Sequence, residues 1–242
     1  MGMLIDGHWQ TDDIRGSANG HFVRPNTMFR NWVTADGRPG PRGNGGFKAE
    51  PGRYHLYVSL ACPWAHRTLI VRKIKGLDRM ISVSVVDPFM GEQGWSFSAP
   101  DGSLTPGATR DDLNDARYLY EIYTLSRRDY TGRVTVPVLW DRETKTIVNN
   151  ESSEIMRILN EAFNGLGAVG DDLYPESWRT QIDELNAVVY DTVNNGVYKC
   201  GFARTQEAYE AAFTPLFQTI DRLEPRLERQ RYLFGTRITE AD

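Results

Sequence analysis

The stretch "YHLYVSLACPWAHRTLIVRKIKGL", Tyr54 to Leu77, joins two kinds of hydrophobic pattern. Its first seven residues alternate and are rich in aromatic and β-branched side chains, which predicts a strand. From Pro63 the apolar residues follow helical spacing as far as Gly76, a residue typical of helix ends. The stretch therefore predicts a strand–helix unit with Cys62 at the junction.

A cysteine in this position has the chemistry of a nucleophile. The first turn of a helix presents backbone N–H groups and the positive end of the helix dipole, and both favour the thiolate of Cys62. Pro63 at the first helical position costs no hydrogen bond. The position is also compatible with a small buried side chain, because cysteines are commonly buried in cores.

The chain has two cysteines, Cys62 and Cys200. No cluster of His and Cys accompanies either one, so the sequence predicts no metal site. Two cysteines without a secretion signal are typical of reduced thiols, although a disulfide between them stays open at this point. We interpret Cys200 as a structural residue.

The predicted elements from Tyr54 to Asn164 follow the order strand, helix, strand, helix, strand, strand, helix. Two βα units followed by a hairpin and a helix predict an α/β fold, a small mixed sheet with helices on both faces. The connection 88–107 is too long for an ordinary turn and is a candidate functional loop. After the strand at 54–60 and the helix at 63–76, the expected elements are a strand over 80–87, a helix over 111–128, strands over 133–141 and 146–150, and a helix over 151–163.

Three segments of different character divide the chain. Residues 1–50 are rich in Gly, Asn and Arg and predict an extended arm, and residues 51–165 hold the predicted sheet. Residues 174–242 show only helical patterns, over 178–198 and 205–230, and predict an all-α domain. Pro215 and Pro225 interrupt the second of these patterns, as a kink or a boundary.

Two further motifs have binding chemistry. In "TVPVLW" a proline opens a strand, and a cis Val136–Pro137 bond would turn the Val136 N–H and C=O toward a ligand; an ordinary edge-strand proline is the alternative. In "NNESSEI" Glu151 and Ser152 precede a helix. Their hydroxyl, carboxylate and nearby N–H groups suit a ligand with a carboxylate and an ammonium, and plain N-capping is the alternative.

Charge and hydropathy exclude several functions. The chain has 28 Lys+Arg and 32 Asp+Glu, a net charge of −4, so it lacks the basic excess of nucleic-acid binding proteins. No apolar run reaches the roughly 20 residues of a membrane span. The N-terminus has no signal-peptide pattern. We expect a cytoplasmic protein without nucleic-acid or membrane partners.

Five motifs together resemble one family, the Xi-class glutathione transferases, or glutathionyl-hydroquinone reductases. They are "CPWAHRTLIVRKIKGL", the "GW" of "GEQGWSF", "GRVTVPVLWD", "NNESSEI" and "YDTVNNGVYKCGFARTQEAYE". The resemblance runs from Met3 to the last residue. It implies a thioredoxin-like glutathione-binding domain followed by an all-α glutathione-transferase domain.

The resemblance also implies roles for individual residues. Cys62 would be the nucleophile, and Ala65 stands where thioredoxin-like oxidoreductases have a resolving cysteine, so an external thiol is needed. Trp95 would cover bound glutathione, and Arg133, or alternatively Arg128, would support its charge. The remaining implied contacts are Val136 and Pro137 with the glutathione backbone, Glu151 and Ser152 with its γ-glutamyl end, and Tyr190 and Tyr198 with a quinol hydroxyl, for which packing is the alternative.

The implied reaction is glutathione-dependent reduction of glutathionyl-hydroquinones through a Cys62–glutathione mixed disulfide. Glutathione would be a co-substrate, no metal or nucleotide would be needed, and the family suggests a homodimer. Two alternatives stay open, an Omega-like thioltransferase or dehydroascorbate reductase and a non-catalytic glutathione-transferase-like fragment. Family members continue beyond "LFGTRITEAD", where Thr239 and Asp242 are typical of a capped helix start, so we expect a C-terminally truncated helical domain.

Overall fold

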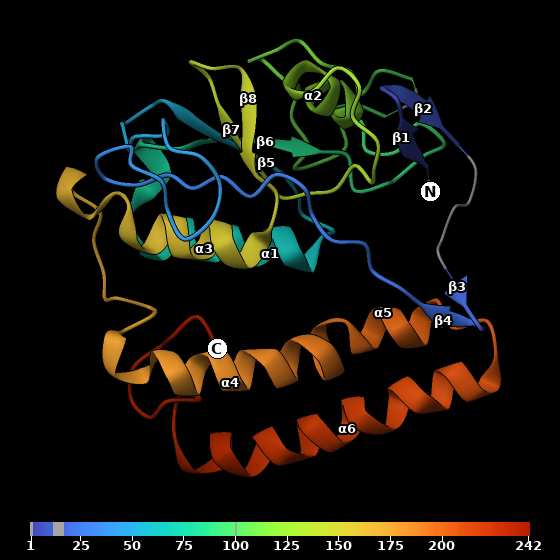
Figure 1. The fold of residues 1–242 in the computed structure, drawn as a ribbon, viewed down its shortest axis with the longest axis vertical. Helices are drawn as coiled ribbons and strands as arrows, with labels where there is room; N and C mark the ends of the chain where they lie inside the picture. Colours follow the sequence, from blue (N-terminus) through green and yellow to red (C-terminus); the bar gives the residue numbers. More distant parts are fainter. Residues whose placement is uncertain (1, 12–16, 100) are drawn as a thin grey trace. The chain divides into compact units, whose positions relative to one another are not determined.

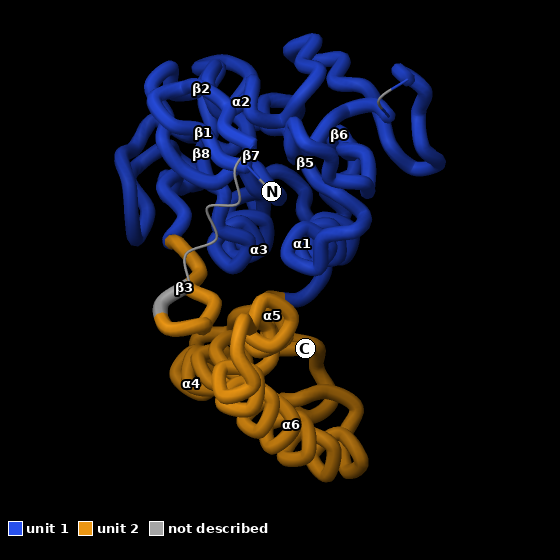
Figure 2. The backbone as a smooth tube through the Cα atoms, turned by 90° about the vertical axis from the view of Figure 1, so that its right-hand side faces the viewer, with its two compact units in different colours: residues 1–14, 26–171 blue, residues 15–25, 172–242 orange. Residues whose placement is uncertain are grey.

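The computed structural model describes residues 2–11, 17–99 and 101–242. They divide into two compact units (Figure 2). Unit 1 comprises residues 1–14 and 26–171, and unit 2 comprises residues 15–25 and 172–242. The N-terminal arm expected over 1–50 is thus shared between the two units and forms no unit of its own among the described residues.

Unit 1 is built on a mixed sheet that has four strands in the described residues, ordered β6-β5-β7-β8. β5 (Tyr54–Ser59) pairs in parallel with β6 (Ser82–Val86) and antiparallel with β7 (Val138–Asp141). β8 (Thr146–Asn149) pairs antiparallel with β7 at the edge. Parallel strands need a crossover connection, and α1 (Pro63–Ile74) supplies it between β5 and β6.

Helices cover both faces of this sheet, as Figures 1 and 2 show. α1 and α3 (Ser152–Glu161) lie side by side on one face, and α2 (Leu119–Ser126) lies on the other. All six residues of β5 are buried between these layers. The expected α/β class with helices on both faces is confirmed.

The segment after residue 25 runs beside the outer strand of the sheet. The Asn31 N–H donates to the Val148 carbonyl at 2.9 Å, and the Asn150 N–H donates to the Phe29 carbonyl at 3.1 Å. Arg30 forms an ion pair with Glu154 of α3. Because an exposed strand edge invites unwanted pairing, this part of the arm protects β8 as well as extending the sheet domain.

The predicted helix over 111–128 is wrong in its first half, since α2 begins only at Leu119. The acidic residues before it form a loop instead of a first helical turn. Asp111 accepts hydrogen bonds from the Tyr57 hydroxyl at 3.0 Å and from the Leu113 and Ala116 N–H groups. This long-range bond to β5 outweighs the local charge pattern that favoured a helix.

Unit 2 is helical, with one small hairpin from the arm. Its long helix α6 (Gln206–Arg229) contains both Pro215 and Pro225, so neither proline is the boundary that was considered. The Thr205 hydroxyl caps α6 by accepting from the Ala208 N–H at 3.1 Å. The other elements are β3 (Ser17–Ala18), β4 (His21–Phe22), the 3-10 helix η3 (Glu176–Trp178), α4 (Arg179–Val189), the π-helical segment η4 (Tyr190–Asn194) and α5 (Gly196–Gly201).

Short elements complete unit 1. The hairpin of β1 (Met3–Ile5) and β2 (His8–Gln10) lies at the beginning of the arm. The 3-10 helices are η1 (Leu77–Arg79) after α1 and η2 (Asn164–Leu166) after α3. Gly76 has a φ of 65°, the left-handed conformation that glycine adopts readily, and this ends α1 where the sequence predicted.

A buried ion pair ties the start of β5 to the end of β7. The Arg53 guanidinium donates to both carboxylate oxygens of Asp141, at 2.9 and 2.7 Å. Burial raises the pKa of Asp141, but hydrogen bonds from Arg53, Thr144 and the Glu143 N–H outweigh it and hold the pKa below its ordinary value. The carboxylate is therefore the favoured form in the folded protein.

We expect Arg53→Met to lower the free energy of unfolding by about 3 kcal/mol at pH 7, because it leaves a buried carboxylate without its cation. The lowered pKa of Asp141 means that this contribution is full above the unfolded pKa of about 4 and is lost as the pH falls below it. Urea unfolding at pH 7 and pH 3 measures both effects. Arg38→Met, which removes an exposed pair with Asp36, is the control; equal losses in the two variants would contradict the prediction.

Candidate active site

Cys62 lies at the N-cap of α1, as the sequence predicted. β5 ends at Ser59, and a tight turn follows in which the Cys62 N–H donates to the Ser59 carbonyl at 3.1 Å. Cys62 has φ −103° and ψ 115°, and Pro63 takes the first helical position. Cys62 is buried at the amino end of the helix, with 9% of the residue exposed. The amino end of a helix favours the thiolate, whereas burial opposes it.

The second motif lies directly beside the cysteine. The Val136–Pro137 peptide bond is cis, and the Cys62 thiol lies 3.5 Å from the Val136 carbonyl oxygen. Both residues of the Val-Pro pair are buried. The segment that leads into β7 therefore lies against the thiol.

Tyr123 of α2 was not identified from the sequence, and it connects the motifs. Its buried hydroxyl donates to the Thr135 carbonyl at 2.8 Å and accepts from the Thr135 N–H at 3.2 Å. It also accepts from the Asn150 side-chain amide at 3.1 Å. Burial raises the pKa of Tyr123, so the hydroxyl stays protonated and able to donate. The Tyr123 hydroxyl thus binds both Thr135, which precedes Val136, and Asn150, which precedes Glu151.

Glu151 and Ser152 form the amino end of α3. The Glu151 carboxylate accepts from the Ser153 N–H at 3.4 Å, so it caps the helix, which was the alternative reading of this motif. The Thr27 hydroxyl donates to its other oxygen at 3.3 Å. The Glu151 side chain is 22% exposed, and its carboxylate also lies 3.8 Å from Nη2 of Arg67.

Arg67 is a second residue that sequence reasoning missed. It lies on α1 and donates from Nε and Nη2 to the Ser152 hydroxyl, at 3.0 and 2.7 Å. Its guanidinium carbon lies 4.9 Å from the centre of the Trp64 ring. The motif around Cys62 includes Arg67, but no local signal in the sequence identifies a partner 85 residues away.

The remaining residues predicted for unit 1 are less closely tied to Cys62 by the interactions described. Trp95 is half-buried in the loop 88–107, and its carbonyl accepts from the Leu119 N–H at 2.9 Å. Arg133 donates to the Gly2 carbonyl at 3.1 Å. Arg128, the alternative to Arg133, is exposed.

The two tyrosines predicted to bind a quinol belong to unit 2. Tyr190 is 41% exposed and opens the π-helical segment η4, a feature often found at functional sites. Tyr198 lies on α5, with the Arg24 guanidinium 4.4 Å from its ring centre and Phe22 stacked at 6.3 Å. Arg24 also donates to the Asn195 side chain at 2.6 Å. The arm residues thus hold the ring of Tyr198.

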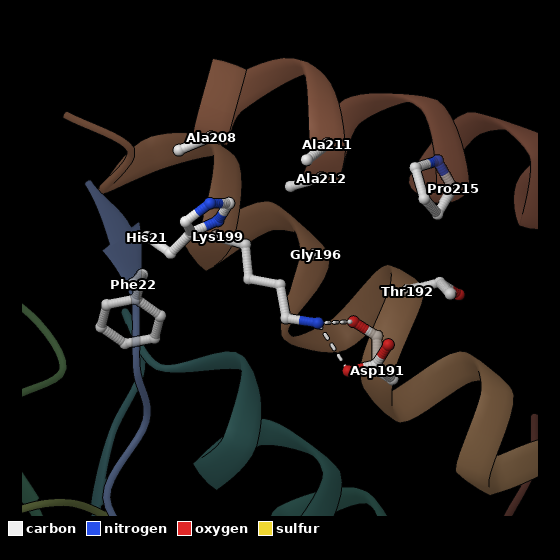
Figure 3. Close-up of a pocket in the computed structure, with 10 residues that line it drawn as sticks. All are labelled: His21, Phe22, Asp191, Thr192, Gly196, Lys199, Ala208, Ala211, Ala212 and Pro215. Carbon is white, nitrogen blue, oxygen red and sulfur yellow. Dashed lines mark hydrogen bonds and ion pairs between the residues drawn. The ribbon is translucent and has the colours of Figure 1, made fainter. Parts of the chain in front are cut away.

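Unit 2 also contains a cavity of about 300 Å³, shown in Figure 3. Lys199 points across it to Asp191, with which it forms an ion pair. Small residues of α6 line one side, and His21 and Phe22 of the arm line another. Phe22 therefore contacts the Tyr198 ring and this cavity alike. The full lining is His21, Phe22, Asp191, Thr192, Gly196, Lys199, Ala208, Ala211, Ala212 and Pro215.

Both cysteines are thiols, with no disulfide between them. Cys200 is half-buried on α5, and burial raises its pKa. Over residues 2–11, 17–99 and 101–242 no group of three or more His, Cys, Asp and Glu side chains is placed to hold a metal ion. Within the same residues no helix is long and apolar enough to cross a bilayer.

Comparison with known proteins agrees with this geometry. Residues 61–162 match the family described as glutathione S-transferase, N-terminal domain. The chain is 58% identical to the glutathionyl-hydroquinone reductase YqjG of Escherichia coli, over 100% of this chain and 73% of that relative.

Solved structures give the same result. The glutathione-bound structure of YqjG has a TM-score of 0.89 at 55% identity and covers 99% of this chain and 71% of that one. The Xi glutathione transferase of Phanerochaete chrysosporium has a TM-score of 0.87 at 54% identity, covering 96% of this chain and 72% of that one. The chain belongs to the glutathione transferases, in the Xi class that contains the glutathionyl-hydroquinone reductases.

The helix-terminal position of Cys62 predicts a reactive thiol. We expect iodoacetamide at pH 6 to modify Cys62 at least about tenfold faster than Cys200. The N–H groups at the start of α1 stabilise the Cys62 thiolate against the cost of its burial, whereas Cys200 lies inside α5, where burial raises its pKa. Peptide mass spectrometry over a time course measures both rates. Equal rates at the two cysteines would refute Cys62 as the nucleophile.

Proposed function

We propose that this chain reduces glutathionyl-hydroquinones to hydroquinones, with Cys62 as the nucleophile. The observation that carries the proposal is the position of Cys62 at the N-cap of α1, with its thiol 3.5 Å from the Val136 carbonyl. A thiolate there would lie beside the backbone edge where the peptide of glutathione can pair. Membership of the Xi class supports the same activity.

The first step breaks a carbon–sulfur bond. The Cys62 thiolate attacks the sulfur of the glutathionyl-hydroquinone and forms a sulfur–sulfur bond with it. The electron pair of the broken bond goes to the ring carbon, which takes up one proton. The products are the free hydroquinone and a mixed disulfide of Cys62 with glutathione.

The second step regenerates the enzyme. A second glutathione attacks, as its thiolate, the glutathione sulfur of the mixed disulfide, and the Cys62 thiolate leaves. Glutathione disulfide is released, so the organic substrate is reduced by two electrons and two glutathione sulfurs are oxidised. Ala65 occupies the position of a resolving cysteine, which is why an external thiol performs this step.

Unit 1 would hold glutathione. Val136 and Pro137 would pair with its backbone, and the Glu151 carboxylate and Ser152 hydroxyl would bind the ammonium and the carboxylate of its γ-glutamyl end. Trp95 would cover the peptide, and Arg133 would support its charge. The supporting contacts are the bond between Cys62 and Val136 and the connection of both motifs through Tyr123.

Unit 2 would bind the hydroquinone. A phenol can donate to or accept from a quinol hydroxyl, so Tyr190 and Tyr198 suit a ring that must be held while its carbon is protonated. The Tyr198 ring is already fixed by Arg24 and Phe22, which favours a defined position for its hydroxyl.

The proposed enzyme needs glutathione as a co-substrate and neither metal nor nucleotide. A reaction that consumes glutathione suits the reducing cytoplasm. A homodimer is part of the proposal, and the exposed aromatic row of Tyr209, Phe213 and Phe217 on α6 offers apolar surface for it. Sedimentation velocity measures the oligomeric state.

Cys62→Ser should abolish glutathione-dependent reduction of glutathionyl-menadiol, because a serine hydroxyl cannot attack the thioether sulfur and leave again. Cys200→Ser should retain the wild-type rate within about twofold. Release of menadiol and of glutathione disulfide, measured in parallel, follows both products. An active Cys62→Ser protein would point to a serine-type glutathione transferase instead.

The tyrosines separate the hydroquinone activity from simple thiol exchange. We expect the double variant Tyr190→Phe and Tyr198→Phe to lower kcat on glutathionyl-menadiol by about tenfold, the scale of one or two lost hydrogen bonds. Exchange of Cys62 with glutathione disulfide, which needs no quinol contact, should be nearly unchanged.

Tyr232→Phe, in the segment of unit 2 that follows α6, is the matched control for this double variant. Dehydroascorbate serves as the comparison substrate for an Omega-like activity. Faster reduction of dehydroascorbate than of glutathionyl-menadiol would favour the Omega-like activity. If the double variant loses menadiol release and exchange with glutathione disulfide by the same factor, the assignment of the tyrosines to the quinol is wrong.

A further inference from the structure

A γ-glutamyl group is a zwitterion, and the residues implied for it supply only one charge. Glu151 provides a carboxylate for the ammonium, but Ser152, the partner of the α-carboxylate, is neutral. A partly buried carboxylate needs a cation or several donors to offset its lost hydration. The interactions described at Ser152 include such a cation, the guanidinium of Arg67.

Arg67 determines what the Ser152 hydroxyl can do. A serine hydroxyl has one O–H donor and two acceptor lone pairs. Two N–H groups of Arg67 donate to the same Ser152 oxygen, at 3.0 and 2.7 Å, and so occupy both lone pairs. What remains is the O–H, which can only donate. Ser152 is thereby prepared for an acceptor such as a carboxylate.

The position of Arg67 also separates the two charges of the ligand. Its Nη2 lies 3.8 Å from the nearer oxygen of Glu151, so a positive and a negative side chain stand next to each other at the start of α3. The guanidinium carbon also lies 4.9 Å from the centre of the Trp64 ring. A zwitterion whose ammonium and carboxylate share one carbon matches this pair of charges.

We infer that Arg67 is a specificity-determining residue that selects the α-carboxylate of the γ-glutamyl group, both through Ser152 and by its own charge. This inference rests on the proposed function, since it assumes that glutathione binds in unit 1. It adds a residue of α1, the helix that begins at Cys62, to the binding of the far end of the peptide. Recognition of the γ-glutamyl end would then be coupled to the helix that activates the thiol.

Two analogues of glutathione test the inference. In 4-aminobutyryl-cysteinyl-glycine the α-carboxylate is missing, and in glutaryl-cysteinyl-glycine the ammonium is missing. The S-methyl forms of glutathione and of both analogues prevent disulfide chemistry, so titration calorimetry reports binding alone. The variants are Arg67→Gln, Arg67→Lys and, as the matched loss of one charge on α1, Lys73→Gln, whose side chain is 79% exposed.

We expect Arg67→Gln to raise the Kd of S-methylglutathione and of the S-methyl glutaryl analogue by about tenfold or more, since charge-assisted hydrogen bonds are lost. Binding of the 4-aminobutyryl analogue should change by less than about twofold. Arg67→Lys should recover part of the loss by its charge but not the two-pronged contact with Ser152. Lys73→Gln should bind all three peptides like the wild type.

Two outcomes would overturn the inference. If Arg67→Gln raises the Kd of all three peptides by the same factor, the residue acts through the packing of α1 on α3. The rate of Cys62 alkylation without ligand would then change as well. If no peptide is affected, the carboxylate lies elsewhere. In both cases a wild-type protein that binds S-methylglutathione leaves the proposed function intact, whereas a wild-type protein that binds no S-methylglutathione overturns both.

Discussion

The hydroxyl of Tyr123 is the interaction on which the relative position of the Val136–Pro137 and Glu151 motifs depends. It is buried, and it uses its donor and both lone pairs on two segments that are distant in the sequence. One segment leads into Val136 and Pro137, and the other leads into Glu151 and α3. A buried hydroxyl with every hydrogen bond made resists displacement, because moving either segment leaves polar groups unpaired in the core. The relative position of the two motifs is therefore set by one side chain of α2.

Residues that act through local backbone geometry could be predicted from the sequence. Cys62 was found from the change of hydrophobic period and the proline after it, and the helix start at Glu151 from the residues that commonly cap helices. The cis bond before Pro137 was one of two readings of a proline that opens a strand. In each case the residues next to the feature in the sequence are enough to predict it.

Residues that act through distant partners could not be found in this way. Tyr123 looked like one apolar position of a helix, and Arg67 like one polar position of another. The same limitation explains the error at 111–118, where the acidic residues resembled a first helical turn. The bond from Tyr57 to Asp111 that prevents this helix joins residues 54 positions apart.

The division into two units has a consequence for how the chain holds together. Residues 15–25 lie in unit 2, where the Arg204 N–H donates to the Gly20 carbonyl at 3.0 Å and Arg24 binds Asn195. Within the described residues the backbone passes between the units after residues 25 and 171. A protease cut at the last crossing would leave both pieces tethered through the arm. Thr27, which donates to Glu151, follows the crossing after residue 25 by two residues. Unfolding of unit 2 would free the backbone that leads into Thr27, which lowers the effective concentration of the Thr27 hydroxyl at Glu151.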